Sequence, residues 1–395
     1  MPSVITSIAR TPIGKFGGAF KTLSAVDLGA VAIRGALERS GLNPEKVDEV
    51  LFGHVLQAGT GQITSRQAAV KAGIPMTVPA TTINKVCLSG MTAIGMADRD
   101  IRLGEATFVV AGGMESMTNA PYLLTKGRYG YGYGNGELVD SMEHDGLFCA
   151  FDQCTMGAQS DGNGARLGVS REIQDEWAAA SHVRAATATE SGVSAAEIVP
   201  VEVPQRRGDP VVVNRDGGIR PDSTPESLAG LRAAFTKDGT ITAGNASQIS
   251  DGAAAVVVAD AAAAEAEGLP VVAEILAYGQ IGGVDATLHE RPAEALRLAL
   301  KKADLSPTDL DVVEINEAFS GVSIWSAKML DLPHEKVNVL GGAVALGHPL
   351  GATGARLIVT LINALRQRGG GIGGATLCGG GGQGDAMVVR VPPTS

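Results

Sequence analysis

Cys87 stands at a predicted junction between a strand and a helix, a place where a thiol can act as a nucleophile. It follows the strand-like segment 78–86 and precedes a helix of small residues expected over 89–99. The free N–H groups at the N-terminus of a helix stabilise a thiolate, which is the nucleophilic form of cysteine. A cysteine between apolar residues is more often simply packed in a core. The position alone therefore leaves both a catalytic and a structural role open.

His348 lies in a glycine-dense turn that could hold an acid–base group. The turn spans 341–351 and reads GGAVALGHPLG, and a helix is expected after it over 352–366. Pro349 biases the residue before it away from helical angles, so the imidazole would sit on a turn of fixed shape. The alternative is a histidine satisfied within the core, although such a residue rarely stands in a turn this rich in glycine.

Cys378 ends an apolar run and enters the glycine-rich segment 379–384. That segment contains the pattern GxGxxG, which opens a helix in a dinucleotide site, but here a strand-like segment, 385–391, follows it. The dinucleotide interpretation therefore fails. A glycine-rich turn after a thiol can instead offer backbone N–H groups to an oxyanion. The two other cysteines, Cys149 and Cys154, show no pairing pattern, and we interpret them as structural or incidental.

An internal repeat indicates the elements that position these residues. The segment 36–50 matches 299–313 at an offset of 263 residues (299 − 36), and a second match, of 104–110 with 373–377, follows in the same order. The first repeated unit reads as an amphipathic helix, a Pro-containing turn and a buried strand. We therefore predict a duplicated α/β domain with right-handed crossovers and a largely parallel sheet in each half.

The repeat also singles out Asn316. This residue falls at the position that Gly53 has in the first copy, so one half carries a polar side chain where the other has none. Glu317, next to it, could equally be a surface carboxylate. A strand-like segment is expected further on, at 338–340.

The segment between the two copies does not repeat. It contains a glycine- and tyrosine-rich stretch, a long polar helix expected over 170–191, and strand-like pieces at 199–203 and 211–213. A patterned helix argues against a disordered linker, so we interpret this segment as a subdomain that covers or specialises the site. The predicted parts are 1–118 with 251–270 as the first half, 119–250 as the insertion, and 271–395 as the second half.

Composition excludes several classes of protein. The 395 residues include 32 Lys and Arg against 42 Asp and Glu, and only 4% are aromatic, which argues against a nucleic-acid-binding surface. The net charge of −10 gives no general attraction to anionic membranes. The start of the chain lacks a signal-peptide core, and the longest apolar stretch, 252–264, falls short of the ~20 residues of a membrane span. Because four scattered cysteines form no disulfide scaffold, we expect a soluble, cytoplasmic protein.

The motifs that are missing narrow the chemistry further. No two histidines have the helical spacing of metal ligands, so no metal site is expected. The chain also lacks GxxxxGK[ST], HExxH and GxSxG. This excludes P-loop NTPases, zincins and α/β-hydrolases.

Taken together, these segments resemble the thiolase family over nearly the whole chain. The motifs that carry the resemblance are NKVCxSG at 84–90, NEAF at 316–319, GHPxGA at 347–352 and CxGGG at 378–382, with further matches at 10–14, 112–117 and 242–247. The resemblance implies a five-layered αβαβα core built from two similar halves, which agrees with the repeat. It also implies that the inserted loop domain binds coenzyme A (CoA).

The resemblance implies a role for each candidate residue. Cys87 would be the nucleophile that takes the acyl group, His348 would activate it, and Cys378 would be the acid–base group that removes the α-proton of the second acyl-CoA. Asn316 would orient a water that forms one oxyanion hole with His348. The backbone N–H groups of Cys87 and Gly380 would form the second hole. An acyl-thioester intermediate divides a difficult carbon–carbon condensation into two easier steps.

Finer matches place the chain near the biosynthetic branch of the family, whose members are homotetramers built as dimers of dimers. The residues that fall where this branch contacts CoA are Met156, Arg220, Phe235, Ser247 and Phe319. Two departures concern the substrate side. Thr155 stands where the branch commonly has histidine, and the segment 285–291 replaces a Gly-Pro-x-Pro approach.

The implied reaction condenses two acetyl-CoA molecules to acetoacetyl-CoA and free CoA, reversibly, in fatty acid metabolism and without a cofactor, since CoA is part of the substrate. One alternative is a degradative 3-ketoacyl-CoA thiolase of broader chain length. A ketoacyl synthase is less favoured, because that group uses Cys-His-His where this chain has Asn316 and Cys378. The alternative of another class is a non-catalytic, thiolase-like binding subunit. Its expected mark is the loss of a catalytic residue, and none is lost.

Overall fold

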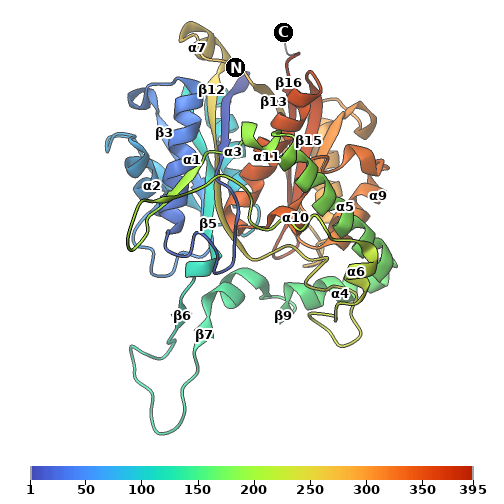
Figure 1. Ribbon diagram of the computed structural model, residues 1–395. Coiled ribbons are helices and arrows are strands. Elements are labelled where there is room, and N and C mark those ends of the chain that lie inside the picture. Colours follow the sequence, from blue (N-terminus) through green and yellow to red (C-terminus); the bar gives the residue numbers. More distant parts are fainter. Residues whose placement is uncertain (1, 394–395) are drawn as a thin grey trace.

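A continuous ten-stranded sheet forms the frame of the protein, and its two halves, called here the first and the second sheet, meet edge to edge (Figure 1). The structure is a computed structural model that describes residues 2–393. The strands of the frame are β1 (Ser3–Arg10), β3 (Glu49–Gly53), β4 (Ala80–Ile83), β5 (Phe108–Ser116), β12 (Ser250–Asp260), β13 (Ala273–Gly282), β14 (Val312–Ile315), β15 (Gly371–Gly379) and β16 (Gln383–Val391), with the short β2 (Gly14–Lys15) beside β12. The order is β1-β12-β5-β3-β4 in the first half and β13-β16-β15-β14 in the second. The halves meet through two residue pairs between β1 and β13.

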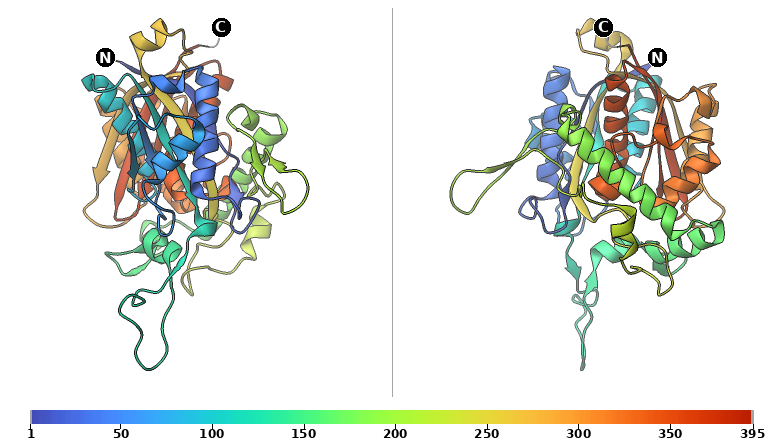
Figure 2. Two further views of the ribbon diagram at one scale, coloured as in Figure 1. Left: turned by 90° about the vertical axis from the view of Figure 1, so that its left-hand side faces the viewer. Right: turned by 45° about the vertical axis from the view of Figure 1, so that its right-hand side comes forward.

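Helices cover both outer faces of this frame and fill the space between the two sheets (Figure 2). They are α1 (Ala25–Ser40), α2 (Thr64–Ala72), α3 (Ser89–Leu103), α8 (Arg291–Lys302), α9 (Ser320–Met329) and α11 (Leu350–Gln367). Helices α1 and α2 lie outside the first sheet, and α8 and α9 lie outside the second. Helix α11 is buried from Leu350 to Leu365 and, together with α3, contacts strands of both sheets. The five-layered arrangement is therefore confirmed.

Small residues let the two central helices approach closely. A Cβ added at Gly354 of α11 would lie 2.4 Å from the backbone nitrogen of Met91 in α3. This contact matters for the site, because α3 follows Cys87 in the chain and α11 follows His348. The helix pair therefore brings two residues from opposite halves of the sequence together.

The predicted duplication is visible element by element. In the first half α1 is followed by a 3₁₀ turn (Pro44–Lys46) and β3, and in the second α8 is followed by a 3₁₀ turn (Pro307–Asp309) and β14. The second sequence match places β5 beside β3 and β15 beside β14, parallel in both halves. The helices predicted over 89–99 and 352–366 are α3 and α11. These predictions are confirmed.

Three strand predictions are wrong. The sheets are mixed and not largely parallel, since β3–β4, β3–β5 and β14–β15 pair in parallel whereas β1–β12, β5–β12, β13–β16 and β15–β16 pair antiparallel. The turn between β15 and β16 is too short for a crossover, so the chain must return antiparallel. The segment 338–340 is a turn, because Asn338 adopts a left-handed φ of 49°. The strand expected over 78–86 is limited to β4, since Val86 has a left-handed φ of 51°.

The segment 119–250 folds mostly outside the two sheets. Its elements are β6 (Tyr122–Leu123), β7 (Val139–Asp140), a π-helical turn (Met142–Leu147), β8 (Phe148–Cys149), β9 (Cys154–Thr155), α4 (Met156–Leu167), α5 (Arg171–Glu190), β10 (Val201–Val203), β11 (Val211–Val213) and α6 (Pro225–Ala229). The long helix and the two strand pieces predicted here are confirmed as α5, β10 and β11. The bounds of the three predicted parts stay a prediction. The remaining short helices are α7 (Ala261–Ala266) and α10 (Ala343–Leu346).

A buried charge cluster fixes this segment against the first half. Arg10 of β1 is 1% exposed and donates hydrogen bonds to Glu197 at 2.5 Å and to Asp216 at 2.7 Å. Both carboxylates belong to the inserted segment. Because an unpaired buried charge is costly, these contacts hold the segment in one position relative to the sheets.

Two kinds of feature are absent from residues 2–393. No helix there is both long enough and apolar enough to cross a membrane. The same residues contain no group of three or more His, Cys, Asp or Glu side chains that could hold a metal ion.

Candidate active site

A strained turn presents Cys87 between β4 and α3. The left-handed Val86 is unusual for a β-branched residue, and its N–H donates to Asn84 Oδ1 at 3.0 Å. Ser89 closes the turn, since its hydroxyl donates to the Val86 carbonyl at 2.6 Å and accepts from the Lys85 N–H at 2.9 Å. Cys87 is buried as a result. Sequence reasoning missed the strain at Val86, although Asn84 and Ser89 flanking it are residues that favour turns.

His348 reaches Cys87 from the other half of the molecule. Its Nε2 lies 3.2 Å from Cys87 Sγ, and its Nδ1 lies 2.6 Å from Thr353 Oγ1. The Thr353 hydroxyl donates to the Pro349 carbonyl at 2.9 Å, so it must accept a hydrogen bond from Nδ1–H. Nε2 is then left without a proton and faces the thiol. Sequence reasoning missed Thr353, for which the only signal was a hydroxyl in the first turn of the helix after His348.

Burial keeps both partners of this pair neutral. It raises the pKa of the Cys87 thiol to about 12, although the backbone N–H groups of Gly380 and Cys87 act in the opposite direction. Burial, aided by the charge of Arg356, lowers the pKa of His348 to about 3. The backbone N–H groups do favour a thiolate at Cys87, as predicted, but desolvation by burial acts more strongly in the opposite direction. The proton has to move from Sγ to Nε2 during the reaction.

Cys378 completes the group of reactive side chains. It lies in β15 just before the glycine turn and is 1% exposed. Burial raises the pKa of its thiol, and the nearby Cys87 raises it further. Cys87, His348, Cys378 and Gly380 line one cavity of about 50 Å³. Its other walls are Gly146, Leu147, Met156, Ser247, Leu288, Ala318, Phe319 and Leu350.

Asn316 stands beside this group at the end of β14. Its side chain is fully buried, and its Nδ2 lies 3.5 Å from His348 Nε2. Its Oδ1 has no hydrogen-bond partner among the described residues. Buried polar atoms are nearly always satisfied, so this oxygen is suited to hold a water or a substrate group next to the imidazole.

Glu317 is a buried anchor and not the surface carboxylate that sequence reasoning left open. It accepts hydrogen bonds from Trp177 Nε1 at 2.9 Å and Ser181 Oγ at 2.8 Å, both in α5. It also accepts from Asn338 Nδ2 at 2.9 Å and from the Val344 N–H at 3.0 Å. Its carboxylate therefore joins α5 and the segment before His348 to the end of β14.

A larger cavity of about 580 Å³ leads to this cluster. The residues predicted to contact CoA all line it, namely Met156, Arg220, Phe235, Ser247 and Phe319. His348 lines both cavities, so the larger one opens onto the reactive group. Such a volume suits a drug-sized or cofactor-sized ligand. Phe235 and Phe319 form one wall, with their rings edge to face and centroids 5.9 Å apart.

The two sequence departures lie at opposite ends of these cavities. Thr155 lines the larger one and caps α4, since its hydroxyl accepts the Ala158 N–H at 3.3 Å. In the segment 285–291, Leu288 lines the small cavity. The backbone of the same segment touches the glycine turn, where a Cβ added at Gly382 would lie 1.9 Å from the Asp285 carbonyl oxygen. Sequence reasoning did not identify Leu288 as a wall of the site.

Comparisons with known proteins agree with this geometry. Residues 3–262 match the family model described as "Thiolase, N-terminal domain", and residues 269–391 match "Thiolase, C-terminal domain". A probable acetyl-CoA acetyltransferase of Mycolicibacterium smegmatis is 52% identical over 98% of this chain and 100% of its own length. The acetyl-CoA acetyltransferase of Cupriavidus necator is 47% identical over 98% of both chains. The crystal structure of the Bacillus anthracis acetyl-CoA acetyltransferase superposes with a TM-score of 0.96 at 42% identity, covering 99% of this chain and 98% of that one.

Proposed function

Because this chain belongs to the thiolase family, we propose that it transfers an acetyl group between two acetyl-CoA molecules, giving acetoacetyl-CoA and free CoA, reversibly. The observation that carries the proposal is the placement of Cys87 Sγ at 3.2 Å from His348 Nε2, with Cys378 in the same small cavity. The names of the relatives support acetyl-CoA as the substrate.

In the first half-reaction Cys87 takes the acetyl group. Its proton moves to His348 Nε2, and Sγ attacks the thioester carbonyl of acetyl-CoA. The backbone N–H groups of Cys87 and Gly380 stabilise the resulting oxyanion; their effect on the pKa of the Cys87 thiol supports this role. The C–S bond to CoA then breaks, and the departing thiolate takes the proton of Cys378. Acetyl-Cys87, protonated His348 and the Cys378 thiolate remain.

In the second half-reaction the Cys378 thiolate removes a proton from the methyl group of a second acetyl-CoA. The raised pKa of this thiol makes its thiolate a strong base. Protonated His348 and a water held by Asn316 stabilise the enolate oxygen. The enolate carbon attacks the acetyl carbon on Cys87, the C–S bond breaks, and the Cys87 thiolate recovers its proton from His348. All protons and thiols are then restored.

The small cavity favours acetyl over longer acyl groups, which argues against the degradative alternative. This cavity is small, about 50 Å³ against about 580 Å³ for the larger one, and Leu288 and Phe319 are among its walls. We expect kcat/KM for the thiolysis of 3-ketooctanoyl-CoA to be at least about tenfold below that for acetoacetyl-CoA, because each misfitting methylene costs binding energy. Leu288→Ala should narrow this difference. Equal rates on both substrates with the unmodified protein would favour the degradative alternative.

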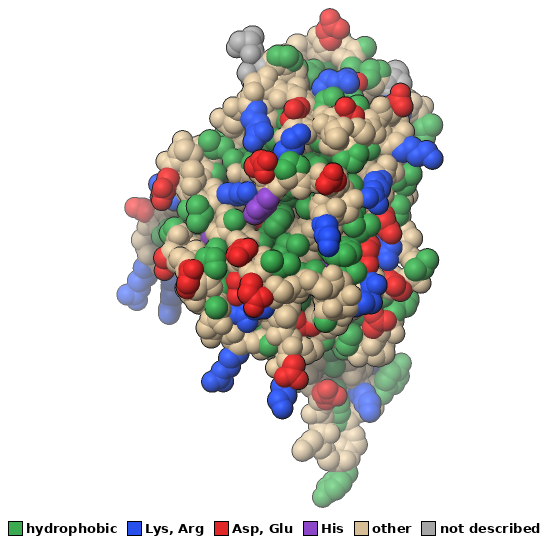
Figure 3. All heavy atoms as spheres, turned by 90° about the vertical axis from the view of Figure 1, so that its right-hand side faces the viewer, with side chains coloured by type: hydrophobic (Ala, Val, Ile, Leu, Met, Phe, Trp, Pro, Cys, Tyr) green, Lys and Arg blue, Asp and Glu red, His purple; other side chains and the backbone are tan. Residues whose placement is uncertain are grey.

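Arg220 is expected to bind the nucleotide end of CoA with a modest contribution. It is exposed at the rim of the larger cavity, and charges of both signs are interspersed on the neighbouring face (Figure 3). Solvent-exposed charge contacts contribute only ~0–1 kcal/mol. Arg220→Ala should therefore raise KM for acetyl-CoA a few-fold and leave kcat nearly unchanged. Steady-state kinetics at two salt concentrations measure this effect.

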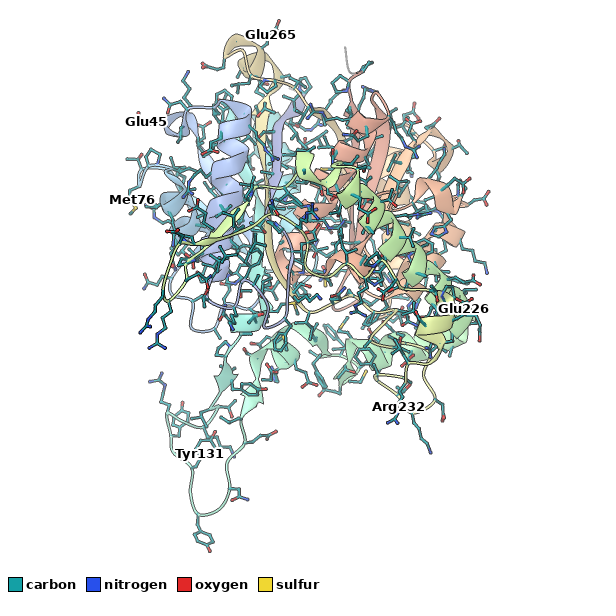
Figure 4. The ribbon with its side chains drawn as sticks, in the orientation of Figure 1. Glu45, Met76, Tyr131, Glu226, Arg232 and Glu265 are labelled. Carbon is teal, nitrogen blue, oxygen red and sulfur yellow. The ribbon has the colours of Figure 1, made fainter. Side chains whose placement is uncertain are left out.

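The matched control for this variant is Arg232→Ala. Arg232 is also exposed (Figure 4) but does not line the larger cavity. The KM of the Arg232→Ala variant for acetyl-CoA should therefore stay at the wild-type value. If Arg220→Ala instead lowered kcat with KM unaltered, Arg220 would act at the reacting centre and the CoA position proposed here would be wrong.

We further propose a cytoplasmic homotetramer, a dimer of dimers that works in fatty acid metabolism with acyl-CoA substrates and no resident cofactor. Four free cysteines suit a reducing compartment. The segment 122–140 forms an arm that extends away from the body (Figures 1, 2 and 4). Large side chains on this arm are exposed, namely Tyr122, Leu124, Tyr129, Tyr131, Tyr133 and Leu138. Contiguous exposed apolar groups of this kind are typical of protein interfaces.

A further inference from the structure

The two cysteines outside the reactive group face each other across a hairpin. Cys149 in β8 is the register partner of Cys154 in β9, and the strands are antiparallel. Side chains directly opposite each other in an antiparallel pair lie on one face of it, with Cα atoms about 4.5–5.5 Å apart. A disulfide bond spans Cα atoms about 4.4–6.8 Å apart. The backbone therefore already has the separation that a bond between them requires.

The sulfurs themselves converge on one residue. The side-chain amide of Gln159 donates to Cys149 Sγ at 3.4 Å, and the backbone N–H of the same residue acts to lower the pKa of the Cys154 thiol. Burial raises the pKa of Cys154, and the neighbouring Cys149 raises it further. These contacts come from α4 and are independent of the strand register. The strand register and the contacts with Gln159 both indicate that the two thiols lie close together.

The hairpin belongs to the wall of the small cavity. Leu147 precedes β8, Met156 follows β9, and both line the cavity. At the tip of the hairpin, Phe151 lies over the glycine turn, where a Cβ added at Gly381 would meet its ring at 3.0 Å. A bond between the strands would therefore restrain two cavity walls at once.

We propose that Cys149 and Cys154 are a reversible modification site, a dithiol that closes to a disulfide and thereby staples the hairpin beside the cavity. The oxidant is a low-molecular-weight disulfide. Cys154, the more exposed of the two, attacks it as a thiolate, forms a mixed disulfide and expels one thiol. The Cys149 thiolate then attacks the Cys154 sulfur and expels the second thiol. Two electrons pass from the protein to the reagent, and the two thiol protons end on the two released thiols.

Peptide mapping in a glutathione redox buffer tests the bond without any assay of activity. After equilibration of the full chain, free thiols are alkylated and the protein is digested with trypsin. Both cysteines lie in one peptide, 129–166, because no Lys or Arg interrupts it. In oxidising buffer this peptide should lose both alkyl groups and two hydrogen masses, and dithiothreitol should reverse the change. Amide hydrogen exchange across 147–156 should slow several-fold at the same time.

Variants separate this pair from the reactive thiols. The bond should still form in Cys87→Ser. In Cys154→Ser, Cys149 should have no partner, and hydrogen exchange in the hairpin should no longer respond to the buffer. Two results would overturn the proposal. The first is that Cys149 and Cys154 of the wild-type protein are still fully alkylated in a buffer oxidising enough to convert all added dithiothreitol to its disulfide. The second is a disulfide bond that links either residue to Cys87 or Cys378.

Discussion

Replacing Cys87 with serine is expected to lower the rate of acetoacetyl-CoA formation by about 10⁴- to 10⁶-fold, the loss seen when the nucleophile of a covalent mechanism is removed. A serine hydroxyl keeps the shape of the site but is far less acidic and less nucleophilic than a thiol. His348 would have to remove a far less acidic proton from this hydroxyl. Intact-protein mass spectrometry after incubation with acetyl-CoA, without an acceptor, should find an acetyl adduct in wild type and none in the variant.

The residue that carries the acetyl group shows which cysteine is the nucleophile. Peptide mapping of the trapped wild-type enzyme should place the acetyl group on Cys87. Cys154→Ser is the matched control, because it removes a thiol that lines neither cavity, and its acetylation should be unchanged. An acetyl group on Cys378 would exchange the roles of the two buried thiols and contradict the mechanism.

The elements that sequence could predict are those with a local cause. The repeat predicted a helix in each half, α1 and α8. Helix α1 also has local causes, because Ser24 caps its start and Gly41, with a left-handed φ of 74°, caps its end. The relative direction of neighbouring strands was predicted wrongly, because it depends on the length and shape of the connection between them. Only the tight turn after Gly379 shows that β16 returns antiparallel beside β15. Asn338 has apolar neighbours on both sides that suggest a strand, yet its side chain bonds to the backbone of Ile315 at the end of β14.

At the site, residue identity was easier to predict than physical state. The motifs singled out Cys87, His348, Cys378 and Asn316, and the structure brings all four together. The sequence did not show that burial raises the pKa of Cys87, because the segments that bury this thiol are remote from it in sequence. Leu288 was missed for the same reason. Leu288 lines the cavity because the segment 285–291 packs on the glycine turn. No local sequence pattern predicts this packing.

Replacing His348 is expected to slow both half-reactions, whereas replacing Cys378 is expected to slow mainly the second. His348→Ala should slow both acetyl exchange and condensation by about 10²- to 10⁴-fold, the usual loss when a general base is removed. This residue takes the proton of Cys87 in the first step and stabilises the enolate in the second. Cys378→Ser should slow condensation by a comparable factor but acetyl exchange far less. A CoA thiolate is stable enough to leave with little assistance, whereas a methyl proton requires a strong base.

Two assays on the same preparations separate these effects. Exchange of labelled CoA with acetyl-CoA reports the first half-reaction alone, and acetoacetyl-CoA formation reports both. The ratio of the two rates should stay near the wild-type value in His348→Ala and should shift strongly toward exchange in Cys378→Ser. If Cys378→Ser instead slowed exchange as much as condensation, its thiol would be needed for Cys87 to take the acetyl group. Since Cys378 shares a cavity with Cys87 and has a raised pKa, such a result would mean that its proton, and not its thiolate, limits the reaction.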